Sequence, residues 1–66
     1  MDYNRIKIVL IEKKIGMKEL AAHLGVKIDT VSRWCRNINQ PSIQTLFTIA
    51  EFLDVSPRVL LVDSKQ

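Results

Sequence analysis

The chain has 66 residues, a formal net charge of +3 and a hydrophobic fraction of 47%, which is typical of one small domain with a thin core. A single Cys excludes an internal disulfide and suits a reducing compartment, and one Cys with one His supplies too few ligands for a structural zinc site. No apolar run reaches about 18 residues and no signal-peptide core follows Met1, so we expect a cytoplasmic protein without a membrane partner.

Positive charge is concentrated in the first part of the chain. Residues 1–40 carry eight Lys and Arg against four Asp and Glu, whereas residues 41–66 carry two against three. A basic part beside a nearly neutral part suits a module that lays one face on a polyanion. Solvated Lys-rich helices produce the same pattern, so charge alone does not decide the function.

The first helix is expected from about Asn4 to Lys14, with Asp2 or Asn4 capping its start. Its apolar stripe at helical spacing contains Tyr3, Ile6, Val9, Leu10 and the stem of Lys13. Ile8 and Ile11 point away from that stripe, where a lone small domain should be polar.

Residues 16–41 indicate two short helices joined by a tight turn. The earlier helix covers about Met17 to His23, Gly25 follows where a positive φ is needed, and Val26 is expected to plug the turn. The later helix covers about Ile28 to Arg36. Val31 and Trp34 are its inward residues, since Trp34 fits a core better than a stacking surface. Asn37 can end it because Asn tolerates the left-handed region.

Two signals for the start of a helix follow along the chain, at Ser42 and at Ser56-Pro57. Ser42 reads as the N-cap of a helix whose core stripe holds Leu46, Ile49, Ala50 and Leu53, with Ile43, Phe47 and Phe52 beside it. Ser56-Pro57 begins a last short helix, about Pro57 to Leu61. The sequence therefore predicts an all-α fold of five short helices in one domain that covers residues 1–66.

This ordered pattern resembles the phage-repressor and Cro-like (XRE-type) helix-turn-helix family, whose domains have the lambda-repressor-like fold. The resemblance extends from about Arg5 to Val62. The residues that carry it are Leu20-Ala21, Leu24-Gly25-Val26, Thr30-Val31-Ser32-Arg33-Trp34, Pro41-Ser42, Thr45-Leu46, Ile49-Ala50, Leu53, Val55-Ser56 and Leu60-Leu61. It implies a helix-turn-helix at about residues 17–36 and a transcriptional regulator, most simply a repressor, that binds palindromic double-stranded DNA as a homodimer.

Several positions depart from the family pattern. Relatives often have Gln where Met17 stands, Ser or Thr where Lys27 stands and Gly where Asn37 stands. Relatives also commonly pair an Arg with a Glu at the positions of Leu10 and Cys35. Replacing both members of a buried ion pair by apolar residues is often neutral or stabilising. We therefore predict that Leu10 and Cys35 touch and that Cys35 is a packing residue.

The DNA contacts are expected on the later helix of the motif and around it. Ile28 can pack on a thymine methyl, Asp29 can accept from a cytosine amino group, and Arg33 can bind guanine through both ends of its guanidinium or bind a phosphate instead. Thr30 is a further candidate for a base contact. Backbone contacts are expected from Met17, Lys18, Lys27, Ser32, Arg36, Asn37, Asn39, Gln40 and Ser42. A solvated polar loop is the alternative for residues 36–40.

One domain of this size covers one half-site, and relatives dimerise to cover two. Val59, Leu61 and Val62 are the candidates for the dimer interface, unless the last residues only close the core. The expected location is the cytoplasm of a prokaryote or phage host, on the nucleoid. Phage regulator, restriction-modification controller and antitoxin remain open, as do repression and activation.

The second hypothesis is a protein-interaction module that kept the fold without specific DNA binding. Met17, Asp29 and the surplus surface Ile residues favour it, while Lys27, Arg33 and Arg36 argue against it. An enzyme is not expected, because the sequence offers no nucleophile with a base, no carboxylate pair and no metal cluster. No cofactor, metal or small-molecule ligand is expected.

Overall fold

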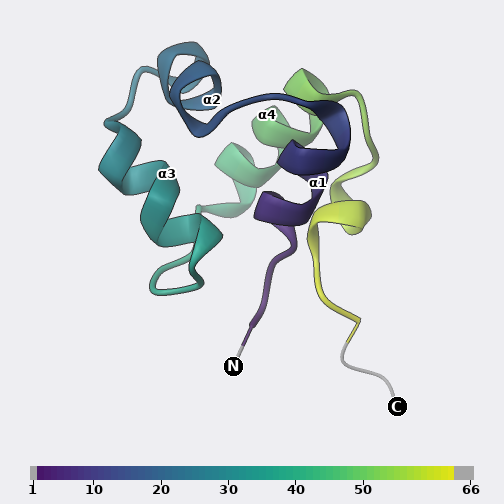
Figure 1. The fold of residues 1–66 in the computed structure, drawn as a ribbon. Helices are drawn as coiled ribbons and strands as arrows, with labels where there is room; N and C mark the ends of the chain where they lie inside the picture. Colours follow the sequence, from purple (N-terminus) through teal and green to yellow (C-terminus); the bar gives the residue numbers. More distant parts are fainter. Residues whose placement is uncertain (1, 64–66) are drawn as a thin grey trace.

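The computed structural model describes residues 2–63, which form four α-helices and a final 3-10 turn (Figure 1). The elements are α1 (Ile6–Lys13), α2 (Met17–Leu24), α3 (Ile28–Cys35), α4 (Ile43–Leu53) and η1 (Pro57–Leu60). The all-α class and the order of the five elements are confirmed, with one correction: the fifth is a 3-10 turn rather than an α-helix. α1 also starts at Ile6 rather than Asn4, because residue 4 pairs with the C-terminal segment.

The core takes side chains from every element. α3 contributes Val31, Trp34 and Cys35, and the other buried apolar residues are Ile6, Val9, Leu10, Leu20, Ala21, Leu46, Ile49, Ala50, Leu53 and Leu60. The inward stripes expected for α3 and α4 are therefore confirmed. Leu10 and Cys35 both join this core, as expected of two apolar residues in place of an ion pair; their direct contact stays a prediction.

Four apolar residues that were expected in the core, beside its stripe on α4 or inside the turn lie at the surface. Tyr3 is 59% exposed because it precedes α1 in an extended segment, where helical spacing does not apply. Ile43 and Phe47 are 70% and 57% exposed, one turn apart on a flank of α4 that the core does not reach. Val26 is 37% exposed, so it does not plug the turn as expected.

All four α-helices end in the same backbone motif. After each helix one residue has a positive φ, at Lys14, Gly25, Asn37 and Asp54. The next amide reaches back to a carbonyl five residues earlier, from Ile15 to Leu10 and likewise in the other three. This is the Schellman arrangement, which satisfies carbonyls that a helix end leaves without partners. It stops each helix sharply and lets short turns follow.

The two ends of the described chain lie side by side below the helices (Figure 1). Asn4 and Leu61 form an antiparallel bridge, in which Arg5 N–H donates to the Leu60 carbonyl at 2.8 Å and Val62 N–H donates to the Tyr3 carbonyl at 3.0 Å. The segment before α1 is thus attached to the segment after η1. The longest described helix, α4, has 11 residues, and none of the helices within residues 2–63 has the length and apolar character to cross a membrane.

Cys35 lies on the inner side of α3 with 9% of its surface exposed. Burial raises the pKa of its thiol above the ordinary value of 9.0, and the positive charge of Lys7 opposes that rise only in part. Because the folded chain holds this proton more tightly, the thiol favours the folded state below pH 9. That contribution is lost as the pH rises through the raised pKa.

The thiol of Cys35 should therefore be unreactive in the folded protein. At pH 8 we expect a disulfide reagent such as Ellman's reagent to modify it about one to two orders of magnitude more slowly than in the urea-unfolded chain, because exchange needs an accessible thiolate. The measurement is the rate of thionitrobenzoate release, with the unfolded chain as control. Equal rates in the two states would contradict a packing role.

The positive φ of Asp54, at 57°, predicts a stabilising substitution. Asp54→Gly should raise the free energy of unfolding by up to about 1 kcal/mol, because Gly adopts this conformation without strain and because a carboxylate at a helix C-terminus opposes the helix dipole. Gly25→Ala is the inverse control. An added Cβ meets nothing within 4 Å there, so φ of +71° alone should make it destabilising, by about 1–2 kcal/mol. Urea denaturation measures both, and a loss of stability in Asp54→Gly would refute the argument.

Candidate nucleic-acid interface

α2 and α3 are joined by a three-residue turn, Gly25 to Lys27. Gly25 N–H donates to the Ala22 carbonyl and Val26 N–H donates to the Ala21 carbonyl, at 3.3 and 3.1 Å. Lys27 then adopts an extended conformation, with φ of −75° and ψ of 149°, and α3 begins. The two helices pack closely on one another, so the turn sets the direction in which α3 leaves the body.

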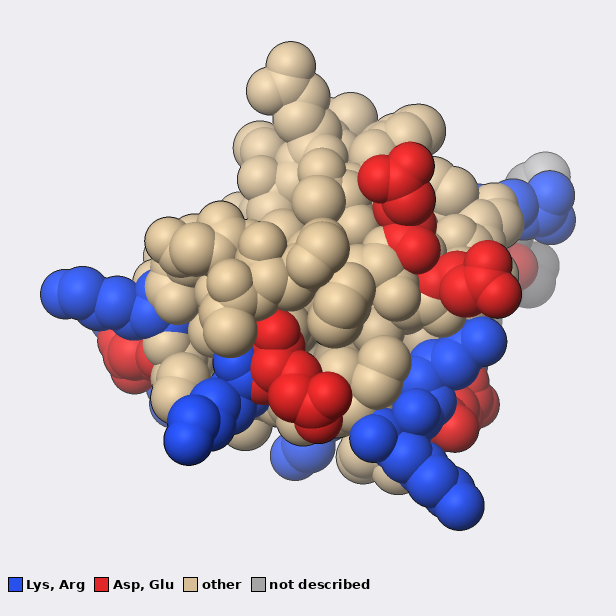
Figure 2. All heavy atoms as spheres, turned by 90° about the horizontal axis from the view of Figure 1, so that it is seen from above, with Lys and Arg blue, Asp and Glu red and all other residues tan. Residues whose placement is uncertain are grey.

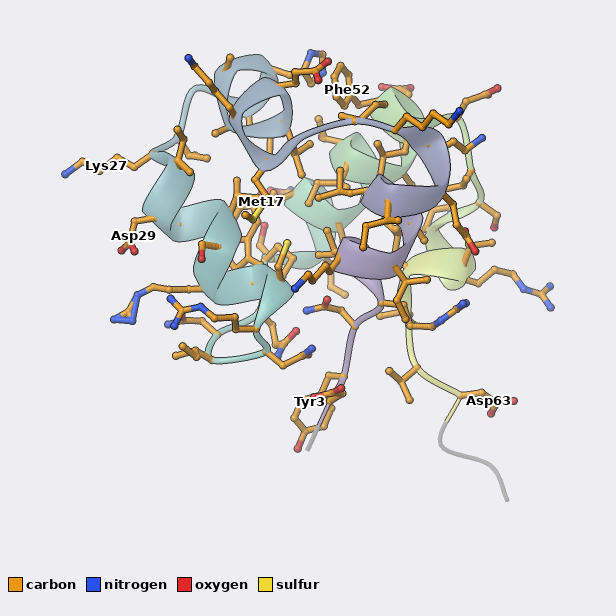
Figure 3. The ribbon with its side chains drawn as sticks, viewed as in Figure 1. Tyr3, Met17, Lys27, Asp29, Phe52 and Asp63 are labelled. Atoms are coloured by element: carbon orange, nitrogen blue, oxygen red, sulfur yellow. The ribbon has the colours of Figure 1, made fainter. Side chains whose placement is uncertain are left out.

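α3 has two different faces. Its inner face, Val31 with Trp34 and Cys35, is buried, while Ile28 on the outer side is 47% exposed. Figure 3 shows Lys27 and Asp29 pointing away from the body at the start of this helix. An eight-residue helix anchored by one face and open on the other can enter the major groove of a duplex.

The outer face carries an ion pair. Arg33 Nε lies 3.7 Å from Asp29 Oδ2, at i, i+4 spacing on the helix, and the two side chains are 46% and 76% exposed. An exposed pair at this spacing contributes only about 0.3–0.5 kcal/mol. Water or a ligand can therefore separate the two groups easily, and both remain available to a partner.

Other candidate base and phosphate residues differ in how far they are exposed. Lys18, Lys27 and Arg36 are exposed, whereas Thr30 and Ser32 are half-buried. Lys27 makes no side-chain cap, as its difference from the family pattern indicated, so the first amides of α3 point outward without a side-chain partner. Asp29 in that first turn partly balances the positive end of the helix.

The start of α2 is held by Glu19. Its Oε1 accepts from Gly16 N–H at 3.1 Å, which leaves Met17 at the first helical position with 36% of its surface exposed. Met17 lies between α2 and α3 in Figure 3. Its thioether offers no strong hydrogen bond, so only its backbone amide suits a phosphate at this helix end.

Residues 36–42 form the segment between α3 and α4. Asn39 is exposed, and Ser42 caps α4, with its Oγ accepting from Thr45 N–H at 3.1 Å. Asn37 and Gln40 bond within the protein: the Asn37 Oδ1 accepts from the amides of Tyr3 and Asn4, and Gln40 Oε1 accepts from Asn4 Nδ2. Two residues that were expected to contact phosphates, Asn37 and Gln40, thus bond the N-terminal segment.

Asn4 is the residue that the sequence reasoning missed. It was considered only as a cap of α1, and it does accept from Ile6 N–H at 3.0 Å. It is also 5% exposed, and its amide bonds residues 30 and 36 positions away. The available signal was weak: an Asn before a helix is ordinary, and no spacing rule links it to positions 34, 37 and 40.

The candidate dimer residues lie in η1 and in the segment that follows it. Leu61 is 46% exposed, while Val59 and Val62 are half-buried and Val59 packs against the core. Ile8 and Ile11 are 48% and 66% exposed on α1, as expected. The apolar surface is therefore divided between α1, α4 and the C-terminal segment.

Seen from above, the molecule carries Lys and Arg around its rim, with acidic side chains between them (Figure 2).

His23 stacks on Phe52, with ring centroids 4.1 Å apart. Near it, α2, α3 and α4 frame a hollow of about 330 Å³ that Trp34 and Thr45 help to line. Within residues 2–63 no group of three or more His, Cys, Asp or Glu side chains is placed to hold a metal ion.

The model of the helix-turn-helix family matches residues 6–60. A protein from Bacteroides fragilis that is assigned as DNA-binding has a crystal structure with 47% sequence identity and a TM-score of 0.89; the match covers 89% of this chain and 95% of that one. No curated protein matches.

Proposed function

The chain belongs to the helix-turn-helix family, and on that basis we propose that it is a transcriptional regulator that binds double-stranded DNA through the outer face of α3. The observation that carries the proposal is the division of α3 into a buried inner face and an outer face that carries Ile28, Asp29 and Arg33. A likeness to a protein assigned as DNA-binding, over most of both chains, supports it further.

Sequence recognition is assigned to four side chains of α3. Arg33 can donate two parallel hydrogen bonds to guanine O6 and N7, and Asp29 can accept from a cytosine amino group. Ile28 can pack on a thymine methyl, and Thr30 is half-buried and serves at the edge of the same surface. Because Asp29 and Arg33 hold each other weakly in the free protein, DNA can replace their ion pair at small cost.

Phosphate contacts are assigned around this helix, where they fix its register in the groove. The backbone amide of Met17 and the side chains of Lys18 and Lys27 contact phosphates on one side of α3. The remaining phosphate contacts are assigned to Ser32, Arg36, Asn39 and Ser42. Asn37 and Gln40 have less hydrogen-bonding capacity left for a phosphate, because their amides already bond Asn4.

The proposal includes a homodimer, a palindromic operator and repression. The protein measures 35 × 24 × 22 Å and carries one recognition helix, whereas palindromic half-sites lie about 34 Å apart. Two copies are needed to read both, and Leu61 with Val59 and Val62 offers an apolar surface for joining them. A place on the nucleoid in the cytoplasm of a prokaryote, or of a cell that carries the phage, follows from this function.

A second candidate is a protein-interaction module. The exposed apolar side chains of Ile43 and Phe47, one turn apart on α4, favour it. Salt dependence separates the two functions. Each phosphate neutralised by a DNA-binding protein contributes about −0.9 to the slope of log affinity against log salt, and an apolar protein interface shows no such slope.

Arg33 is the residue whose replacement tests base reading. Selection of bound sequences from a random duplex library should enrich a palindrome with the wild-type protein, and Arg33→Ala should relax one symmetric position, with a loss there of about 1–3 kcal/mol. Arg33→Lys is the control, since it keeps the charge and loses the two-pronged geometry. If Arg33→Ala instead weakens all sequences equally and lowers the salt slope by about 0.9, the residue is a phosphate contact.

Leu61 tests the dimer. Leu61→Ser should shift the protein from dimer to monomer in sedimentation equilibrium and should weaken binding to a full palindrome more than to a single half-site. Ile11→Ser is the matched control, because Ile11 is more exposed and lies outside the proposed interface. A dimer that survives Leu61→Ser and dissociates in Ile11→Ser would move the interface to α1.

A further inference from the structure

Three carboxamide side chains join the end of α3 to the N-terminal segment. Asn4 Nδ2 donates to the Trp34 carbonyl at 2.9 Å and to Gln40 Oε1 at 2.6 Å. Asn37 Nδ2 donates to the Asn4 carbonyl at 3.2 Å, and Gln40 Nε2 donates to Asn37 Oδ1 at 3.2 Å. Each of the three amides therefore bonds both of the others, directly or through the backbone, and we call Asn4, Asn37 and Gln40 the amide cluster.

The Asn37 carboxamide bonds the backbone of Asn4 through both its oxygen and its nitrogen, as the backbone of a neighbouring β-strand would. Its Oδ1 accepts from Asn4 N–H at 3.0 Å and its Nδ2 donates to the carbonyl of the same residue. On its other side Asn4 pairs with Leu61. The N-terminal segment is thus enclosed between the end of α3 and the C-terminal segment.

Because Asn4 is buried, the amide cluster favours one set of hydrogen-bond partners. Asn4 is the one buried polar residue among residues 2–63, and no buried side-chain nitrogen or oxygen in that range lacks a partner. A buried amide is costly unless it is bonded. Displacing Gln40 would remove one of the two acceptors of Asn4 Nδ2, and displacing Asn37 would remove the partners of the Asn4 backbone N–H and carbonyl. The cluster therefore favours one position of the segment that follows α3.

Few other bonds hold that segment. Beyond the Schellman bond from Ile38 N–H to the Arg33 carbonyl, the hydrogen bonds from residues 38–41 to the rest of the described chain are those of Gln40. Arg36 and Asn39 are exposed beside it, and neither side chain bonds elsewhere in the described part of the molecule. The backbone of Arg36 is held by α3, since its N–H donates to the Ser32 carbonyl at 3.0 Å, whereas the placement of Asn39 depends on the cluster.

We propose that the amide cluster is a positioning device for DNA binding: Asn37 and Gln40 hold the segment after α3 so that Asn39 meets a DNA phosphate. The proposal rests on the DNA-binding function proposed above and changes the role of Asn37 and Gln40 from phosphate contacts to positioning residues. Because a pre-ordered segment loses less conformational freedom on binding, the cluster raises affinity without touching the DNA.

Asn37→Gly is the main variant. Gly accepts the φ of 59° and removes the carboxamide. We expect DNA affinity to fall about tenfold, as for the loss of one hydrogen bond to a phosphate, with an unchanged salt slope because Asn39 carries no charge. Asp54→Gly, at φ of 57°, is the matched control, since it changes the same backbone conformation after α4 and should not lower affinity. Gln40→Ala, at an exposed position, is the milder second variant and should weaken binding in the same direction.

A double-mutant cycle with Asn39→Ala separates positioning from direct contact, with affinity measured by fluorescence anisotropy at a temperature where circular dichroism shows every variant folded. If Asn37 acts by placing Asn39, Asn37→Gly should have much less effect in the Asn39→Ala protein. Additive losses would overturn the proposal in favour of direct phosphate contacts. Unchanged affinity of folded Asn37→Gly would also overturn it and leave the cluster a purely structural role.

Binding by the wild-type protein separates the positioning proposal from the DNA-binding function on which it rests. If the wild type binds DNA with salt dependence and both cluster variants bind equally well, the positioning proposal is rejected and the DNA-binding function stands. Absence of salt-dependent DNA binding by the wild type rejects both. Amide hydrogen exchange at Tyr3 and Asn4 supplies an independent readout: both should exchange faster in Asn37→Gly and not in Asp54→Gly, and unchanged exchange would contradict the described cluster.

Discussion

Burial of the inner face of α3 is the interaction on which the rest of this structure depends. A helix of eight residues is too short to be stable in water by itself. It persists here because Val31, Trp34 and Cys35 enter a core shared with every other element. The same burial fixes the rotation of the helix about its axis, and so it decides which residues face outward. The outer face is therefore a consequence of core packing.

The polar groups of the backbone impose a second constraint, since a small domain has many helix ends and little interior. Four Schellman motifs satisfy the helix C-termini and let each turn stay short. The N-terminal segment has no helix to satisfy it, and the amide cluster with the bridge to Leu61 does so instead. A polar residue in the core is tolerated because all of its bonds are made.

The surface combines modest charge with several exposed apolar side chains. The one ion pair on the outer side of α3 is weak, which suits a face that must exchange internal partners for a ligand. Ile28 lies on that same face, while other exposed apolar residues lie on α1, on α4 and in the C-terminal segment.

Local patterns in the sequence determined much of this protein: the positions of the helices, their core stripes, the left-handed residues at Gly25 and Asn37, the cap at Ser42, and the i, i+4 pair of Asp29 and Arg33. Each depends on residues within one helical turn or one tight turn, where propensity and spacing suffice. The resemblance to a known family added the placement of the motif.

Tertiary structure alone decided the rest. Tyr3, Ile43 and Phe47 continue apolar patterns and yet lie at the surface, because thirteen buried apolar residues already fill the core of so short a chain. The last element is a 3-10 turn, and Leu61 after it pairs with Asn4. The buried amide of Asn4 was invisible to periodicity, since its partners lie 30 and 36 residues away and are brought to it only when α3 packs against α1.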